Sequence, residues 1–418
     1  MSQSTLQHQT PVVGTGLRNG EGAHASVAAD PVKGPLAWEP AALSQEGGQD
    51  SYVLSLDPSE ALEIGNALQS LKGLGVGLDK ISPQNFQLAE SLRQRLDSVS
   101  AALHDGPGLA LIRGMDTSQL SAEDNLSAYL GVASYIGDQL GLQDKEGKVV
   151  SWSVHANGVK VHVTDAKQWA SPYEKRHDLH TNGSLPFHTD MGCDILSLQV
   201  RHCAKEGGYT RVASSATIYN DLLENNPEVL KTLCESQWPI QVSGREQRYI
   251  LCPLVERNGD KIMMSLDPGR LGLHPNTARP HPADRHPGGV PPLTEAQLAA
   301  LAALSQTAER HSLRVRAQPG DVLLLNNWAL LHARDSYTDN NGAGEERRHL
   351  VRLWLRSSAR GWDVPDSMRV PWQAAYEYDA AGVDVKKQYA VEPEKVYKEP
   401  KYTTGSASFV LEDDTDEE

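Results

Sequence analysis

The chain has 418 residues and a formal net charge of −15, with 39% hydrophobic residues. Much of the excess negative charge lies in the tail 412–418. The overall excess argues against a nucleic-acid partner, because proteins that bind nucleic acids present basic surfaces to the phosphates. No apolar run is long enough to span a membrane, and the N-terminus lacks the apolar core of a signal peptide. We therefore expect a cytoplasmic protein with no membrane partner.

Composition divides the chain into three parts. Residues 1–35 are rich in Gly, Ala, Ser, Gln and Thr without periodicity, and we expect them to be disordered or draped on the surface. A single catalytic domain is expected over 36–400, followed by an acidic tail over 401–418. None of the cysteines stands in a Cys-x-x-Cys pair, so free thiols are expected in place of a disulfide or zinc framework.

Four amphipathic segments predict helices. In the first, Asp57 and Glu60 form a capping box with Pro58 at the first helical position. In the last, Thr294 and Gln297 form another, and Leu298, Leu301 and Leu304 are expected on the buried face. The predicted helices span 57–71, 82–103, 122–140 and 294–308.

The first half of the candidate site is a His-x-Asp motif. On an extended strand, His188 and Asp190 point to the same side and Thr189 points away, so that two ligands can share one metal. The next segment, 195–200, reads as a strand, and the Gly-Gly of 207–208 marks a turn before another one. His188 is therefore expected on the rim of a sheet.

The second half begins with the buried strand 322–325 and leads to His332. A further strand, 347–356, alternates so that Arg348, Arg352 and Arg356 share one face with two apolar residues. Buried guanidinium groups need anions, and small carboxylate ligands would satisfy them. Two imidazoles and one carboxylate with open positions opposite them are what a non-haem Fe(II) oxygenase requires.

The two halves of this site lie far apart in the sequence, so one core must contain both. Predicted helices flank the strands that carry the candidate ligands, and a further buried strand is expected over 108–114. The expected fold is therefore a mixed α/β structure with a mainly β core, a double-stranded β-helix (jelly roll, cupin-like) with flanking helices.

Four ordered segments of this chain resemble the TauD/TfdA family of Fe(II)/2-oxoglutarate oxygenases, and in order and spacing they are most similar to fungal members of secondary metabolism. The resemblance extends over residues 105–365, and it rests on 187–190, 207–215, 319–332 and 347–352.

The resemblance implies a role for each matching residue. His188, Asp190 and His332 would ligate iron. Thr210 and Arg348 would hold the distal carboxylate of 2-oxoglutarate, the arginine as a bidentate fork. Arg352 would face the substrate or the inner carboxylate of the cosubstrate. Substrate contacts in such relatives often precede the metal motif, which makes weak candidates of His155, His162, His177, His180, Asn182 and Phe187.

The function implied is O2- and 2-oxoglutarate-dependent oxidation of a C–H bond by hydroxylation, desaturation or cyclisation, with release of succinate and CO2. The substrate would be a small polar metabolite, such as an amino-acid-like carboxylate. A zinc hydrolase is one alternative, since the same ligands suit zinc, but it leaves the arginine strand unexplained. A catalytically silent barrel that only binds a ligand is another, and the complete ligand set disfavours it. The oligomeric state is open, a homo-oligomer included.

Overall fold

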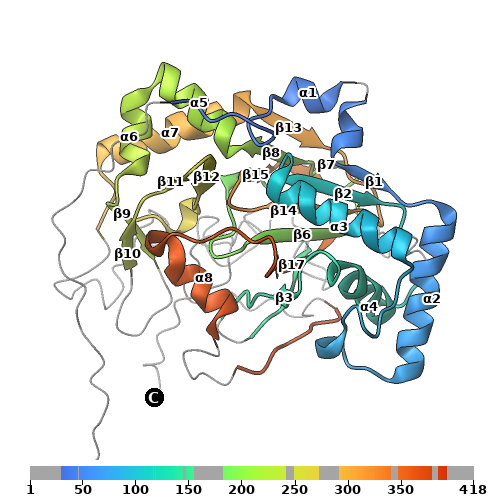
Figure 1. Ribbon diagram of the computed structural model, residues 1–418. Helices are drawn as coiled ribbons and strands as arrows, with labels where there is room; N and C mark the ends of the chain where they lie inside the picture. Colours follow the sequence, from blue (N-terminus) through green and yellow to red (C-terminus); the bar gives the residue numbers. More distant parts are fainter. Residues whose placement is uncertain are drawn as a thin grey trace, which may run out of the picture.

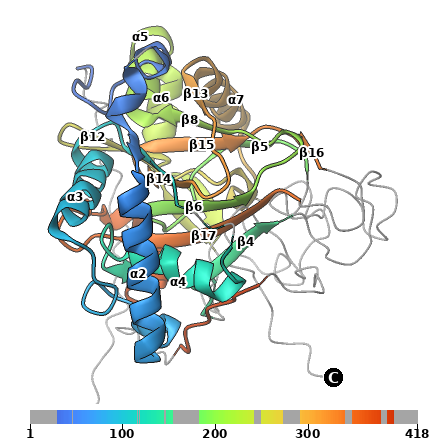
Figure 2. The ribbon, with the colours of Figure 1, turned by 90° about the vertical axis from the view of Figure 1, so that its right-hand side faces the viewer.

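A computed structural model describes residues 30–45, 47–115, 117, 119–144, 147–154, 182–241, 249–272, 291–339, 347–378 and 385–392. These parts of the chain form four layers, in which two sheets face each other and helices cover their outer surfaces (Figures 1 and 2). This is the expected double-stranded β-helix with flanking helices. The acidic tail and most of the N-terminal segment that we expected to be disordered or draped on the surface lie outside the described residues. Within its described part, 30–35, Val32 is 2% exposed and packs in a core.

The larger sheet has seven strands in the order β1-β2-β14-β6-β17-β3, and β4 also pairs with β17. All of its neighbouring pairs are antiparallel except β1 with β2. Its strands are Val53–Ser55 (β1), Leu109–Arg113 (β2), Gln139–Leu140 (β3), Val150–Val154 (β4), Ile195–His202 (β6), Val322–Asn326 (β14) and His349–Arg356 (β17).

The smaller sheet has four antiparallel strands in the order β13-β8-β15-β5. They are Leu185–His188 (β5), Thr210–Ser214 (β8), Ser312–Val315 (β13) and Leu330–Arg334 (β15). Three two-stranded sheets complete the strands: Trp238–Gln241 (β9) with Tyr249–Cys252 (β10), Val255–Asn258 (β11) with Lys261–Met264 (β12), and Glu206–Gly207 (β7) with Tyr337–Thr338 (β16).

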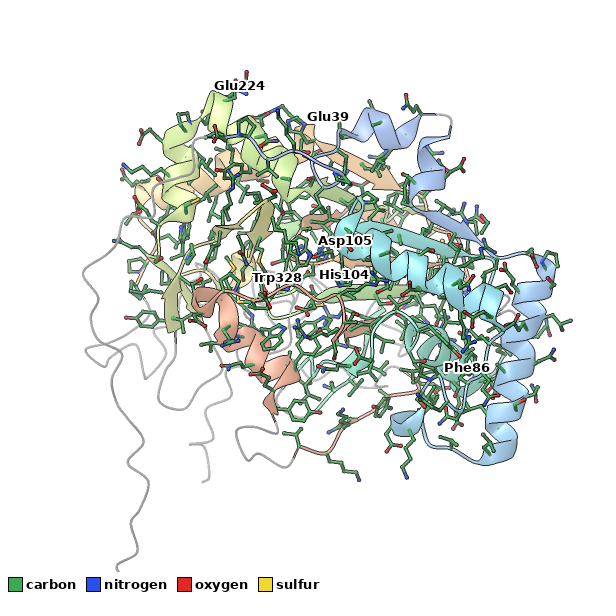
Figure 3. All side chains as sticks on the ribbon, viewed as in Figure 1. Glu39, Phe86, His104, Asp105, Glu224 and Trp328 are labelled. Atoms are coloured by element: carbon green, nitrogen blue, oxygen red, sulfur yellow. The ribbon has the colours of Figure 1, made fainter. Side chains whose placement is uncertain are left out.

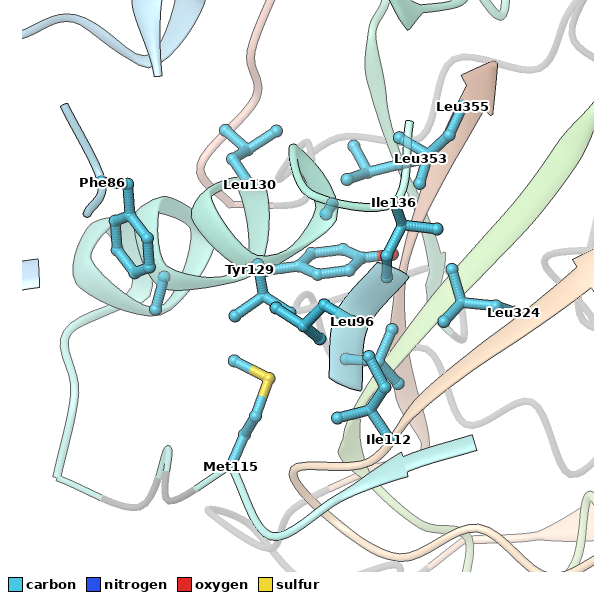
Figure 4. Packing of buried hydrophobic residues seen from close by; sticks show 14 of the residues in the cluster. Phe86, Leu96, Ile112, Met115, Tyr129, Leu130, Ile136, Leu324, Leu353 and Leu355 are labelled. Atoms are coloured by element: carbon cyan, nitrogen blue, oxygen red, sulfur yellow. The ribbon is translucent and has the colours of Figure 1, made fainter. Parts of the chain in front are cut away.

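Alternation along the strands sorts the apolar side chains into separate cores. On β14, Leu323 and Leu325 face the smaller sheet, whereas Val322 and Leu324 face the helices. The helix-facing core contains Phe86, Tyr129 and other side chains seen in Figure 4. A third core lies between the smaller sheet and its helices. The faces predicted for the arginine strand are confirmed, because Leu350 and Trp354 join the core between the sheets while Val351, Leu353 and Leu355 face the helices.

Helices cover both outer surfaces (Figure 2). The larger sheet is covered by Pro58–Leu74 (α2), Glu90–Asp105 (α3) and Ala122–Ala133 (α4), and the smaller one by Ser215–Asn225 (α5), Pro227–Cys234 (α6) and Glu295–Arg310 (α7). Two short helices, Pro40–Ser44 (α1) and Arg369–Tyr376 (α8), lie outside these groups. None of the helices in the described ranges is both long and apolar enough to cross a membrane.

A local side-chain interaction explains one helix boundary that the sequence misplaced, and a distant strand pairing explains another. The second predicted helix begins at Glu90 and not at Ser82, because the Asn85 side chain accepts from the Ser82 N–H and donates to the Lys80 carbonyl. Such bonds offer the backbone an alternative to the helix. The third ends at Ala133 because the following chain pairs as β3 with the end of β17.

The buried face predicted for α7 is confirmed at Leu304 and Leu301 and wrong at Leu298. Leu304 is buried and Leu301 packs against the core, but Leu298 is 54% exposed, and the buried side is completed by Gln297, Ala300, Thr307 and Ala308. The capping box is present, and its Gln297 side chain also donates to the Gln237 carbonyl. That bond turns Gln297 toward the protein, and its neighbour Leu298 consequently faces solvent.

His311 joins three elements and predicts a pH-dependent contribution to stability. Its Nε2 lies 2.7 Å from Asp221 Oδ2 on α5, and its Nδ1 lies 3.0 Å from Glu39 Oε2 before α1. Burial alone would lower the pKa of His311, but these hydrogen bonds raise it above 6.5 on balance. The contribution is therefore complete below the unfolded pKa and is lost as pH rises through the folded one.

We expect His311→Gln to lower the free energy of unfolding by about 1 kcal/mol at pH 5.5, and by less at pH 9, because partly exposed ion pairs are weak. Urea unfolding of both proteins at the two pH values measures this difference. An equal loss at both pH values would contradict the assignment.

Candidate metal centre

His188, Asp190 and His332 come together between the two sheets. His188 is the last residue of β5, and His332 stands opposite it in the middle of β15. The two rings have centroids 4.2 Å apart, and Asp190 Oδ1 lies 3.9 Å from His188 Nε2 and 3.7 Å from His332 Nε2. One ligand atom from each residue falls within 4.8 Å of the others, and all three residues are buried. His332 follows the predicted strand 322–325 and lies within the next strand, β15.

The position of the His188 ring fixes which nitrogen can bind a metal. Its Nδ1 lies 2.8 Å from the carbonyl oxygen of Pro186. A carbonyl can only accept, so Nδ1 carries the proton and Nε2 keeps its lone pair. This Nε2 faces Asp190 and His332. A ring held in this way is typical of a histidine that ligates a metal.

The two oxygens of the Asp190 carboxylate have different surroundings: one is hydrogen-bonded by the protein and the other faces the candidate metal centre. Oδ2 accepts hydrogen bonds from Arg352 Nη1 at 2.9 Å and from Trp354 Nε1 at 2.9 Å. Oδ1 is left on the side of the two imidazoles. The pair of donors therefore orients the carboxylate so that one oxygen points at the place where a metal would sit.

Charges around the triad favour the protonation states that a metal needs. Burial alone would raise the pKa of Asp190, but Arg352 and the two histidines lower it below its ordinary value, so the carboxylate is ionised. Burial, together with His188, lowers the pKa of His332 to about 3. A neutral imidazole offers its lone pair across the physiological range. The donor set, two imidazoles and one carboxylate, fits Fe(II).

Asn327, at the turn between β14 and β15, holds the chain that carries Asp190. Its Oδ1 accepts from the Asp190 N–H, and its Nδ2 donates to the carbonyls of Asp190 and Cys193, each at 2.8 Å. On the opposite side, Thr189 exchanges two hydrogen bonds with Leu266, so it points away from the centre as predicted. Both ligand-bearing segments are thereby tied to one another.

We expect Asn327→Leu to weaken Fe(II) binding by at least about tenfold and to lower the free energy of unfolding by about 2 kcal/mol or more. The substitution leaves a buried N–H and two carbonyls without this partner, and each such group costs about 1–3 kcal/mol. Metal titration and urea unfolding measure the two effects, with Asn66→Leu on the exposed face of α2 as the control. Unchanged metal affinity would contradict the prediction, because it would show that the turn carrying Asp190 keeps its shape without the Asn327 side chain.

The arginines of β17 are not all directed to external anions, which corrects the sequence-based expectation. Arg352 is paired with Asp190, and Arg356 with the buried Asp194. Arg352 Nε also donates to Gln143 Oε1 at 2.8 Å and to Ser151 Oγ at 2.9 Å. The protein's own carboxylates therefore neutralise two of the three guanidinium groups on this face.

Arg348 lies at the other end of the strand, where it is 5% exposed. Its guanidinium stacks on the Tyr337 ring at 5.3 Å from the centroid, and its Nε lies 3.3 Å from the Gly208 carbonyl. A Cβ on Gly208 would approach the Arg348 side chain to 2.9 Å, so glycine leaves room for it. Thr210 stands two residues further on, opposite Arg334 in the pairing of β8 with β15. The two residues expected at the cosubstrate thus lie on neighbouring segments.

Several residues at the centre gave no signal of their role in the sequence. Gln143 and Ser151 hold Arg352, and Trp354 holds Asp190, although only its strand face could be read from the alternation. Arg270 is 2% exposed, and the charge of Asp190 acts on it. Of the weak substrate candidates, Phe187 belongs to the core under α5–α7. The four histidines from 155 to 180 lie outside the described residues.

A double-stranded β-helix with two imidazoles and a carboxylate between its sheets defines the class of non-haem iron oxygenases. Within this class, the family described as "Taurine catabolism dioxygenase TauD, TfdA family" matches residues 70–354. The chain belongs to that family, as the sequence motifs had indicated. As a member of this family with a complete triad, it is a non-haem iron oxygenase dependent on 2-oxoglutarate, with Fe(II) as cofactor and 2-oxoglutarate and O2 as cosubstrates.

Known proteins support the same assignment. The taurine hydroxylase-like protein SAT17 of Stachybotrys chartarum is 30% identical over 350 residues, which cover 82% of this chain and 84% of that protein. FR-33289 synthase of Streptomyces rubellomurinus is 27% identical over 354 residues, covering 81% and 94% of the two chains.

Two solved structures show the same fold. One is an asparagine oxygenase in complex with Fe(II), 2S,3S-3-hydroxyasparagine and succinate, with a TM-score of 0.55 and 16% identity over 73% of this chain and 94% of that one. The other is the non-haem iron oxygenase OrfP with Fe and alpha-ketoglutaric acid, with a TM-score of 0.51 and 19% identity over 74% and 95%.

Proposed function

We propose that His188, Asp190 and His332 bind Fe(II) and that the enzyme oxidises a C–H bond of a small polar metabolite, by hydroxylation, desaturation or oxidative cyclisation, with release of succinate and CO2. The observation that carries the proposal is the buried triad, in which Asp190 Oδ1 and two histidine Nε2 atoms face one another while the remaining polar atoms of His188 and Asp190 are held by the protein. Such prior orientation of the ligands suits a centre that must keep one geometry through turnover.

The same proposal assigns 2-oxoglutarate to Arg348 and Thr210. A buried guanidinium can bind one carboxylate of a dicarboxylate with two parallel hydrogen bonds, and the threonine hydroxyl adds a further hydrogen-bond donor. When bound, Fe(II) and 2-oxoglutarate supply the oxidative decarboxylation that makes O2 reactive toward the substrate. The chain's own residues bind and orient the reactants and exclude water from them.

Arg352 is again assigned to the inner carboxylate of 2-oxoglutarate or to the substrate. Its hydrogen bond to Asp190 gives it a second role, which is to orient a metal ligand. It would hold the metal carboxylate with Nη1 while the rest of its guanidinium meets an anion. Arg270 brings a second buried cation toward Asp190 from a different segment, next to Asp267. Both guanidinium groups are paired with carboxylates of the chain, so a substrate carboxylate would meet them as hydrogen-bond donors and not as uncompensated charges.

An amino-acid-like substrate agrees with this charge distribution. The related folds include structures that contain hydroxyasparagine or hydroxyarginine, and those ligands are properties of the other proteins. The zinc-hydrolase alternative is disfavoured by the family and by the arginine at the proposed cosubstrate site. The silent-barrel alternative is disfavoured by the complete triad.

Succinate release tests the proposal. Metal-free protein is loaded with Fe(II) or Zn(II) and supplied with 2-oxoglutarate, O2 and a panel of amino acids and other small carboxylates. We expect substrate-stimulated succinate only with Fe(II), together with a product heavier by one oxygen or lighter by two hydrogens. Hydrolysis of a panel member by the Zn(II) form, without succinate, would overturn it in favour of the hydrolase.

A further inference from the structure

The C-terminal helix α8 packs directly on the turn that carries Asp190. Within that turn, Gly192 adopts a φ of 91°, and a Cβ at this position would lie 2.6 Å from the carbonyl oxygen of Pro371 on α8. Only a residue without a side chain permits so close an approach at a positive φ. Figure 1 shows α8 in front of the strands, between β10 and β3. The family match ends at residue 354, so α8 lies beyond it.

Asp194, four residues after Asp190, is the main link between α8 and the turn. Its carboxylate is 3% exposed. Oδ1 accepts from Trp328 Nε1 at 2.6 Å and from Trp372 Nε1 on α8 at 3.1 Å, while Oδ2 accepts from Arg356 Nη1. The Arg356 guanidinium also stacks on the Trp372 ring at 4.7 Å. Trp328, labelled in Figure 3, follows Asn327 at the β14–β15 turn. The Asp194 carboxylate therefore connects α8, β17 and both segments that carry the candidate ligands.

A second connection runs from α8 to Arg352. The Ala375 carbonyl on α8 accepts a hydrogen bond from the Leu142 N–H at 2.9 Å. Gln143, which follows Leu142 in the chain, accepts from Arg352 Nε and donates to the Arg352 carbonyl. Tyr376 donates its hydroxyl to the Leu355 carbonyl at 3.0 Å and accepts from the Asp194 N–H at 3.2 Å. The turn that carries Asp190 is therefore hydrogen-bonded to α8 directly, and Arg352 is linked to α8 indirectly, through Gln143 and its neighbour Leu142.

We propose that α8 is a positioning element for the metal carboxylate, acting through Trp372, Asp194 and the Gly192–Pro371 contact. The inference rests on the proposed ligand set and adds that residues outside the family-wide region set the affinity for iron. A carboxylate ligand has to be held within about 0.5 Å of its productive place, and groups that orient ligands typically change metal affinity by about 10- to 100-fold. Trp372, Asp194 and Gly192 touch no reactant in this scheme.

Two variants test the inference. Trp372→Phe keeps the buried ring and removes the N–H donor, and Gly192→Ala pushes the turn away from Pro371. The control is Val370→Ala, which lies on the exposed side of the same helix at 42% exposure. Fe(II) affinity is measured anaerobically by titration in the presence of 2-oxoglutarate, and thermal unfolding is measured on the metal-free proteins.

We expect both variants to bind Fe(II) about 10-fold or more weakly than the wild type. At saturating Fe(II), their KM for 2-oxoglutarate should stay within about twofold, because Arg348 lies at the other end of β17 from Arg356. Val370→Ala should match the wild type in both respects. A variant that melts earlier but binds iron with wild-type affinity would overturn the proposal and leave α8 a purely structural helix. An equal loss in iron and 2-oxoglutarate binding would overturn it as well. If the wild type itself does not bind Fe(II), the proposed ligands His188, Asp190 and His332 are refuted, and this inference is refuted with them.

Discussion

Asp190→Ala is expected to abolish product formation, with a loss of at least about 100-fold, and to remove tight Fe(II) binding. The carboxylate is the one anionic member of the triad, and its Oδ1 faces both histidines. Removing an orienting partner already costs about 10- to 100-fold in metal affinity, so removing the ligand itself should cost more. Metal content, Fe(II) titration and product formation with an identified substrate measure the effect.

The loss must be separated from unfolding, because Asp190 also neutralises buried Arg352. Breaking a buried pair can cost about 3–5 kcal/mol, so a lowered melting temperature is expected, although the fold should survive. Circular dichroism checks the fold, and Asp97→Ala, which removes an exposed partner of Arg360, controls for loss of an ordinary ion pair. Full turnover by a folded Asp190→Ala protein would refute the metal assignment.

Arg348→Lys is expected to raise the KM for 2-oxoglutarate by about 10- to 100-fold while Fe(II) affinity without cosubstrate changes little. Lysine keeps the charge but cannot form the two parallel hydrogen bonds of a guanidinium. A hydrogen bond to a charged group is worth about 1.5–3 kcal/mol, and 1.4 kcal/mol corresponds to a factor of ten.

The matched control is Arg360→Lys, which makes the same change at a half-buried arginine paired with Asp97. Steady-state rates of succinate formation at varied 2-oxoglutarate give both KM values. If Arg348→Lys leaves the requirement unchanged, the cosubstrate binds elsewhere, and Arg348 serves to pack against Tyr337 and Gly208.

Much of the fold could be predicted because its signals are local. Alternation gave the two faces of β17 correctly, and the capping box at Asp57 gave the start of α2. The helix boundaries near 82 and 133 and the exposure of Leu298 on α7 were missed. They depend on the Asn85 side chain, on pairing with β17 and on the bond from Gln297 to Gln237, all of which involve partners that local periodicity does not reveal.

Some residues of the site could likewise be predicted from the sequence, and others could not. The three candidate ligands could be named because two short motifs and an arginine strand occur in the order typical of a family. The groups that hold them could not, since Asn327, Gln143 and Trp354 meet Asp190 or Arg352 across long stretches of sequence. The expectation that small external carboxylates satisfy the arginine face failed at Arg352 and Arg356 for the same reason. Asp190 and Asp194 supply the anions for Arg352 and Arg356, and only the folded chain brings them there.

An anaerobic titration of the metal-free protein with Fe(II) and 2-oxoglutarate tests the central claim most directly. We predict a visible metal-to-ligand charge-transfer band that saturates with the metal and is lost in His188→Ala. Such a band requires the cosubstrate to chelate iron held by the protein, so it reports on the ligands and the open positions together. Binding of metal without the band, or an unchanged band in His188→Ala, would contradict the proposed centre.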